Sequence, residues 1–205
     1  MRLPTRKAPW LAEAFQQTVP IILGYLPIGF AYGVLAQKTG LSSVNTLLMS
    51  LLVFAGSAQL IAVGLFAAGT GPASVILTTF IVNLRHLLMS AALAPYLRGW
   101  SSWLQALFAF QLTDETFALH ASRFPGGELI KPRILSVNII AQTAWLAGTF
   151  LGLIASTLIT DITPIGLDYA LPAMFIVLLV WQVTSLVRLS AAVIGGLFSV
   201  GLFLA

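Results

Sequence analysis

The sequence predicts an all-α polytopic membrane protein of about seven transmembrane helices, with one or two spans broken or kinked. Apolar residues make up 59% of the 205 residues and charged residues only 8%, against about 25% charged residues in soluble domains. Such a chain lacks the polar surface that a water-soluble globule needs. Its apolar runs are continuous and long, which favours membrane helices over the alternating strands of a membrane barrel.

Seven apolar segments follow one another with short connections, which indicates a single integral membrane domain over residues 1–205. The expected spans are residues 16–36, 46–68, 73–97, 102–118, 134–159, 170–186 and 189–205. Apolar residues at helical spacing within 10–15 predict a short interfacial helix ahead of the first span. The turn at residues 69–72 is so tight that the second span could instead be broken or re-entrant.

The basic residues predict that the N-terminus is cytoplasmic. In this orientation only Lys38 and Arg98 fall in outer loops. The basic residues expected inside are Arg2, Arg6, Lys7, Arg123, Lys131, Arg133 and Arg188. We therefore expect a multi-pass protein of the cell inner (plasma) membrane. The basic residues are spread thinly and without interleaved aromatics, so they do not indicate nucleic-acid binding.

The first span contains five residues that disturb or loosen a helix, namely Pro20, Gly24, Pro27, Gly29 and Gly33. Proline removes an intrahelical hydrogen bond, and glycine gives the backbone extra freedom. This composition favours a bent or broken helix over a plain packing helix.

The second span carries Phe54-Ala55-Gly56-Ser57-Ala58-Gln59 near its middle. One interpretation is a locally unwound helix whose free backbone groups bind substrate. The other is close helix packing on the small residues, with a hydrogen bond from Gln59 to a neighbouring helix. The residues alone leave both interpretations open.

Arg85 lies near the centre of the third span, where an arginine costs from about 3 to more than 10 kcal/mol. Asp114 and Glu115 are the only acids placed deep in a span, so one of them is the expected partner of Arg85. The pair could be structural and fix the register of two helices. The hypothesis that we favour is a site that binds a zwitterion or carries a proton.

Two further polar residues flank Arg85 in the third span. Asn83 and His86 share a helix face, whereas Arg85 lies about 200° from Asn83, so different partners are expected. His86 could titrate near neutral pH. A lone intramembrane histidine more often makes a hydrogen bond across helices.

The function that these features favour is secondary transport rather than catalysis, and we expect no cofactor. The chain contains no cysteine, which excludes thiolate chemistry and a cysteine-based zinc site, and no Walker A motif. One alternative is an intramembrane hydrolase using Ser57 with His86 or His120, although no Gly-x-Ser-x-Gly elbow is present. The other is a non-transporting scaffold, which leaves the buried charges unexplained.

Five stretches, spread in order over nearly the whole chain, resemble the AzlC family, the large permease subunit of bacterial branched-chain amino acid exporters. They are GYLPIGFAYG at 24–33, FAGSAQ at 54–59, NLRH at 83–86 with MSA at 89–91, TDETFA at 113–118 and LDYALPAMF at 167–175. The resemblance implies efflux of valine, leucine and isoleucine, and a small AzlD-type membrane subunit as partner. The chain departs from the family where it stops, because family members usually continue past the equivalent of Ala205.

A hydrophobic amino acid needs a cation or helix N-terminus for its carboxylate, an acceptor for its ammonium group and an apolar pocket for its side chain. The residues expected to bind the substrate are Phe30, Phe54, Gly56, Ser57, Gln59, Asn83 and Arg85, with Phe117 as a further aromatic candidate. The residues expected to couple transport to protons are Asp114, Glu115 and His86.

Overall fold

The computed structural model describes residues 10–159 and 185–204, with isolated positions between them. Three of the described helices are long and apolar enough to cross a membrane: α1 (Trp10–Lys38), α4 (Pro72–Leu93, continued by the 3-10 turn Ala94–Leu97) and α7 (Lys131–Ala155). The expected class, a helical membrane protein, is thus confirmed. The expected sixth span and the run at 167–175 fall largely outside the described residues.

Helix α1 is continuous from Trp10 to Lys38 and includes Pro20 and Pro27 in its interior. The interfacial helix expected at its start is therefore the first part of α1 itself. The helix ends before Gly40, whose φ of 86° lies in the left-handed region that glycine adopts without strain.

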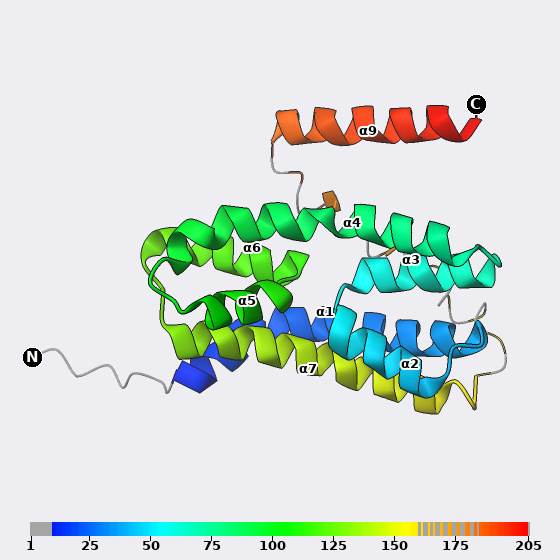
Figure 1. The fold of residues 1–205 in the computed structure, drawn as a ribbon, viewed down its shortest axis with the longest axis horizontal. Helices are drawn as coiled ribbons and strands as arrows, with labels where there is room; N and C mark the ends of the chain where they lie inside the picture. Colours follow the sequence, from blue (N-terminus) through cyan, green and yellow to red (C-terminus); the bar gives the residue numbers. More distant parts are fainter. Residues whose placement is uncertain are drawn as a thin grey trace, which may run out of the picture.

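Helices α1 and α7 lie side by side along the length of the molecule (Figure 1). Gly29 and Gly33 of α1 face Gly148 and Gly152 of α7. A Cβ atom on Gly29 would lie 2.8 Å from a backbone oxygen of α7, and one on Gly148 would lie 2.6 Å from a backbone oxygen of α1. Small residues spaced by four allow such close backbone approach in lipid. Gly29 and Gly33 therefore serve packing, and they do not break the helix.

The two packed helices run in the same direction. Glu13, near the start of α1, forms an ion pair of 2.8 Å with Arg133 at the start of α7. The glycine contacts lie further along both helices, so residue numbers rise together. Because α1 and α7 are parallel, the chain between them must return across the molecule in the opposite direction. Helix α4 makes this return crossing (Figure 1).

The second expected span is instead a helical hairpin, formed by α2 (Ser43–Leu48), a π-helical turn (Met49–Val53) and α3 (Gly56–Ala67). The chain reverses at Phe54 and returns to the end where the hairpin begins (Figure 1). Gln59 on the returning arm donates a hydrogen bond of 3.1 Å to Ser50 on the entering arm. A straight helix would separate these two residues by about 13 Å, since each residue adds 1.5 Å.

The fourth expected span is also a hairpin, made of α5 (Ser102–Phe110) and α6 (Asp114–Arg123). The chain reverses at residues 111–113, and the two arms pack on each other through aromatic rings. The ring of Phe108 on α5 lies 5.3 Å from that of His120 and 6.3 Å from that of Phe124. Two expected spans thus become two hairpins that enter from opposite ends of the molecule and point their tips at each other (Figure 1).

Each hairpin has its own apolar core. The first hairpin packs on α1 and α7 through a cluster that includes Tyr32, Leu60, Val63 and Trp145. The second packs on α4 and the start of α7 through another cluster, in which Leu93, Phe108 and Ile134 are buried. These clusters hold both tips about halfway along the molecule. At that depth in a membrane, no water is available to hydrogen-bond the free backbone groups of a broken helix.

One end of the molecule collects the basic side chains, and we call it the basic end. Arg123, Lys131 and Arg133 lie there, beside the start of α1. Arg98 belongs to the same end, because Lys131 donates to the carbonyl oxygen of the adjacent Gly99 at 3.4 Å. The expectation that Arg98 lies opposite these residues is therefore wrong, since it assumed that the intervening residues 102–118 cross the membrane. Lys38 lies at the opposite end.

Helix α9 (Leu186–Leu204) covers most of the last expected span. It stands apart from the other helices in Figure 1 and is exposed along nearly its whole length. A Cβ atom at Gly195, Gly196 or Gly201 would meet nothing within 4 Å among the described residues.

Candidate functional site

The two hairpin tips meet beside α4 and enclose a small pocket. Its lining residues are Tyr25, Ile28, Phe54, Ala55, Gly56, Ser57, Arg85, His86, Thr113, Asp114, Glu115 and Trp145. The cavity measures about 20 Å³, which is room for about one water molecule. The site is therefore closed in this conformation, and a larger ligand requires the surrounding elements to move.

The N-terminus of α3 faces this pocket without a side-chain cap. Ala55 is the N-cap residue and lacks a capping oxygen, so the first N–H groups of α3 have no partner in the helix. Phe54, just before it, has φ 44° and ψ 46°, a strained conformation for a bulky residue. The chain break thus lies at Phe54 and Ala55, at the start of the run Phe54–Gln59 for which an unwound helix was one of two interpretations, and Gly56–Gln59 itself is helical. A helix N-terminus carries about half a positive charge and attracts anions.

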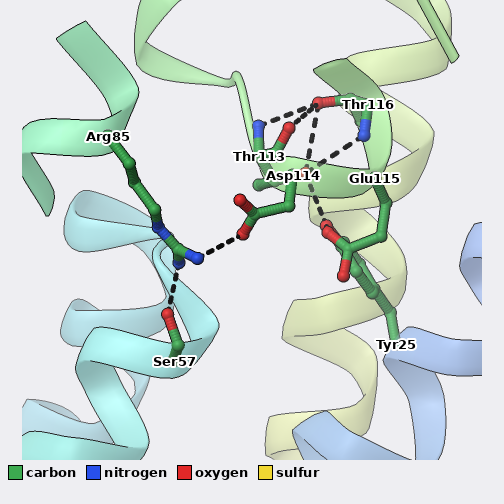
Figure 2. Close-up of polar contacts among 7 residues, drawn as sticks. All are labelled: Tyr25, Ser57, Arg85, Thr113, Asp114, Glu115 and Thr116. Carbon is green, nitrogen blue, oxygen red and sulfur yellow. Dashed lines mark hydrogen bonds and ion pairs between the residues drawn. The ribbon is translucent and has the colours of Figure 1, made fainter. Parts of the chain in front are cut away.

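Arg85 reaches both tips from the middle of α4, as Figure 2 shows. Its Nη1 lies 2.7 Å from Oδ2 of Asp114 on the second hairpin, and its Nη2 donates to Oγ of Ser57 on the first. The expected ion pair with one of the two acids is thus confirmed. The Arg85 and Asp114 side chains are 27% and 18% exposed, so the pair is only partly buried by the described residues.

The second tip is organised by a cap and a tyrosine (Figure 2). Thr113 is the N-cap of α6 and forms a reciprocal capping box with Thr116. The Tyr25 hydroxyl lies 2.6 Å from Oε2 of Glu115 and 2.5 Å from Oγ1 of Thr113. Its single hydrogen goes to the carboxylate, and its oxygen accepts from the threonine. Tyr25 thereby ties α1 to the second tip and orients Glu115.

Trp145 of α7 forms the floor of the pocket against the first tip. Its ring fits against Gly56, where an added Cβ atom would lie 2.9 Å from the ring. Tyr25 packs edge-on against it at 5.6 Å, and Tyr32 stacks on it at 6.0 Å. The buried Nε1 of Trp145 has no hydrogen-bond partner among the described residues, although buried indole N–H groups usually have one.

The structure brings most of the residues expected at the site together. Phe54, Gly56, Ser57, Arg85, His86, Asp114 and Glu115 all line the pocket. Five further lining residues, which the predicted site did not include, complete it: Tyr25, Ile28, Ala55, Thr113 and Trp145. The signal for Trp145 was its place near the middle of an expected span, since membrane tryptophans usually lie at the interfaces.

Four expected residues are not part of the lining. Gln59 is fully buried inside the first hairpin, where it bonds Ser50. Phe30 lies at the close crossing of α1 and α7, and its carbonyl oxygen faces Gly152. Phe117 packs in the core of the second hairpin. Asn83 keeps a buried Oδ1 without a hydrogen-bond partner in the described part of the chain.

The geometry gives no hydrolytic pair at Ser57. Within residues 10–159, its hydroxyl contacts Arg85 and neither histidine. His120 lies towards the basic end, where its Nε2 is 2.8 Å from Oδ1 of Asn138.

The pocket has two chemically distinct sides and apolar walls. Arg85, the open N-terminus of α3 and the Trp145 indole supply hydrogen-bond donors or positive charge. Asp114 and Glu115 supply carboxylates on the second tip. Two broken helices that meet at mid-membrane are the arrangement in which transporters bind small charged substrates.

Comparisons of the sequence with known proteins identify the family of the chain. Residues 20–159 match the family model described as AzlC protein. An uncharacterized membrane protein of Archaeoglobus fulgidus is 33% identical over 93% of this chain and 83% of its own length. The branched-chain amino acid transport protein AzlC of Bacillus subtilis is 29% identical, over 86% of this chain and 70% of its own length.

The inner membrane protein YgaZ of Escherichia coli is 27% identical, over 93% of this chain and 81% of its own length. No solved structure matches the chain. The matched region, residues 20–159, includes most of α1, both hairpins, α4 and α7, and with them every residue that lines the pocket. The chain therefore belongs to the AzlC family.

Proposed function

We propose that this chain is the permease subunit of a secondary transporter that exports branched-chain amino acids across the inner membrane. Two lines support the proposal: the name of the Bacillus subtilis relative, a branched-chain amino acid transport protein, and the two-sided pocket between the hairpin tips. The pocket is the single observation that carries it, because donors, carboxylates and apolar walls are the three requirements of a zwitterion with an apolar side chain.

The substrate carboxylate would bind where positive charge collects. Arg85 and the uncapped N-terminus of α3 lie on one side of the pocket, and Trp145, whose Nε1 has no partner among the described residues, also lines it. A carboxylate would accept hydrogen bonds from these groups and compete with Asp114 for the arginine. Binding would therefore weaken the Arg85–Asp114 ion pair of 2.7 Å.

The ammonium group and side chain would take the opposite side. Glu115 and Asp114 supply acceptors for the ammonium group. Ile28, Phe54 and the Trp145 ring supply apolar walls. A branched side chain buries about 0.8 kcal/mol per CH₂ in such a wall.

Proton coupling would use the same ion pair. A proton on Asp114 would remove its charge and with it an acceptor for the substrate ammonium group, so that proton and substrate would occupy the site in turn. His86 and Glu115 line the same pocket and are the alternative carriers. Entry of the proton and exit of the amino acid would then be linked, because the Asp114 carboxylate holds either a proton or the substrate ammonium group.

The orientation proposed for the chain follows from the distribution of basic residues between the two ends of the molecule. With the basic end cytoplasmic, Arg98, Arg123, Lys131 and Arg133 lie inside, and Lys38 is the only basic residue of the described range 10–159 outside. This distribution fits the positive-inside rule better than seven full spans did. The first hairpin would then enter from the outside and the second from the cytoplasm.

The partner proposed is a small AzlD-type membrane subunit. The small-residue face of α9, with Gly195, Gly196 and Gly201, is uncovered by the described residues and suits close helix packing in lipid. We expect co-expression with such a subunit to raise export at least about tenfold. Full export by this chain alone would contradict the need for a partner.

The test of the function is leucine transport by the protein, purified together with the small subunit, in liposomes with an imposed pH gradient. We expect gradient-driven leucine transport in the wild type, and at least a tenfold loss in Arg85→Ala. Arg98→Gln is the matched control, since it removes a cation from the basic end and leaves the pocket intact. Transport of leucine by Arg85→Ala at the wild-type rate would overturn the assignment of the site.

A further inference from the structure

One side chain joins the two hairpin tips. Gln142 of α7 is 8% exposed and lies between them. Its Nε2 donates at 3.0 Å to the carbonyl oxygen of Leu51, in the π-helical turn of the first hairpin. Its Oε1 accepts at 2.9 Å from Nε2 of Gln111, at the end of α5 in the second hairpin. Both ends of one amide are thus used, one for each hairpin.

The two hairpins are also related to each other by local geometry. Four residues connect each hairpin to the long helical segment before it, and both connections run into a Gly-x-Ser-Ser sequence: Gly40 to Ser43 in the first and Gly99 to Ser102 in the second. The glycines have φ 86° and 87°. The capping serines, Ser42 and Ser101, have φ,ψ of −66°,149° and −63°,150°.

These matches lie 59 positions apart and occur in units that point in opposite directions. One unit is α1 with the first hairpin, and the other is α4 with the second hairpin (Figure 1). Each unit consists of a long helix, a short turn and a hairpin, and the two hairpins enter from opposite ends of the molecule. Inverted units of this kind place a binding site at their interface and let each unit move against the other.

The pocket itself requires such a motion. Its volume of about 20 Å³ holds one water, not an amino acid.

The two hairpins also differ in the contacts that hold them in place. Near the second hairpin, Arg133 pairs with both Glu13 and Glu128, and Arg123 pairs with Glu128, at 2.8–3.2 Å. Along the first hairpin runs an open groove of about 690 Å³.

We propose that the two hairpins are gates opening the site to opposite sides of the membrane, and that Gln142 is the positioning residue that couples them. This inference rests on the proposed transport function. Either tip can leave the site only by breaking its hydrogen bond to Gln142. The other bond then keeps the remaining tip in place, so both gates do not open together.

The first experiment fixes one gate at a time, and the chain's lack of cysteine makes it direct. Ser50 Oγ and Thr149 Oγ1 lie 2.8 Å apart, so Ser50→Cys/Thr149→Cys can form a disulfide that ties the first hairpin to α7. His120→Cys/Asn138→Cys, joined by a short bifunctional thiol reagent, ties the second hairpin to α7. A third cysteine, Ala55→Cys, reports access to the pocket.

We expect the lock on the first hairpin to stop labelling of Ala55→Cys from the outside and leave labelling from the cytoplasmic side. The lock on the second hairpin should do the reverse, and opening either cross-link should restore both. This readout needs no substrate, so it stands even if leucine is not transported. Labelling from both sides in either locked protein would overturn the gate assignment.

The second experiment isolates the coupling residue. Gln142→Leu removes both hydrogen bonds and keeps a similar volume. We expect leucine transport to fall at least tenfold while the dissociation constant for leucine changes less than threefold. Gln105→Leu is the control, because Gln105 bonds only the backbone oxygens of Leu97 and Trp100 near its own hairpin's start. Equal loss of binding and rate in Gln142→Leu would show a merely structural role.

Discussion

At the scale of single residues, the account depends on how one arginine is shared. Arg85 contacts Ser57 on the first tip and Asp114 on the second. It can keep both contacts only while the two tips stay close together. The sequence alone predicted that its partner is either Asp114 or Glu115, because an unpaired charge at that depth is too costly. It did not predict Ser57 as the second contact, since hairpin reversal at Phe54 has no periodic signature.

The first prediction concerns Asp114. Asp114→Asn keeps the shape of the side chain and removes both its negative charge and its ability to bind and release a proton. We expect gradient-driven leucine efflux to be abolished while leucine binding remains measurable, because the arginine is still available to the carboxylate. Efflux from proteoliposomes and equilibrium binding check the two parts. Glu128→Gln, an acid at the basic end, should keep wild-type efflux.

Gradient-dependent efflux at the wild-type level in Asp114→Asn would contradict this role for Asp114. The proton carrier would then be Glu115 or His86, which line the same pocket, or transport would not be coupled to protons.

The second prediction concerns Tyr25. Tyr25→Phe leaves Glu115 and Thr113 without the hydroxyl that joins them. We expect a loss of about 1–2 kcal/mol in the free energy of unfolding, together with reduced transport. Tyr96→Phe is the matched control, since Tyr96 packs on Phe124 and its hydroxyl has no hydrogen bond among the described contacts. Thermal unfolding in detergent compares the two variants. Equal stability of both would contradict a stabilising role of the hydrogen bonds from Tyr25 to Glu115 and Thr113.

At the scale of elements, the close crossing of α1 and α7 is the rigid part of the molecule. Sequence reasoning noticed Gly29 and Gly33 and interpreted them as helix breakers. The structure places them opposite Gly148 and Gly152, where backbone approaches backbone. Their partners lie more than a hundred residues later in the chain. Helix composition alone therefore could not distinguish packing from bending.

The third prediction tests this crossing. Gly148→Ala places a Cβ atom 2.6 Å from the carbonyl oxygen of Leu26, and backbone cannot yield as a side chain does. We expect about 1–3 kcal/mol of destabilisation, seen as a lower melting temperature by tryptophan fluorescence. Gly24→Ala, on the same helix pair but with open space around it, should be neutral or slightly stabilising. A melting temperature of Gly148→Ala at or above that of Gly24→Ala would contradict the packing.

At the scale of the whole molecule, composition was sufficient to predict a helical membrane protein. The acids and the arginine were sufficient to predict where its polar site lies. The span count was not predictable in the same way, because an apolar run of about 20 residues satisfies length and hydropathy either as one span or as two short arms. Only the turn at residues 69–72 hinted at the difference. Reassigning the two runs also moved Arg98 to the basic end, where the other basic residues already lay.

The most direct test of the central claim is the sidedness of the loops that flank each hairpin. Single cysteines at exposed positions serve this purpose: Ser43 and Ala73 around the first hairpin, Ser102 and Gly126 around the second. Labelling with a membrane-impermeant maleimide in vesicles of known orientation reads their side. The account predicts that Ser43→Cys and Ala73→Cys label together from outside, and Ser102→Cys and Gly126→Cys together from the cytoplasmic side. Labelling of the two members of either pair from opposite sides would mean that the segment crosses the membrane, and would contradict the opposed hairpins that form the site.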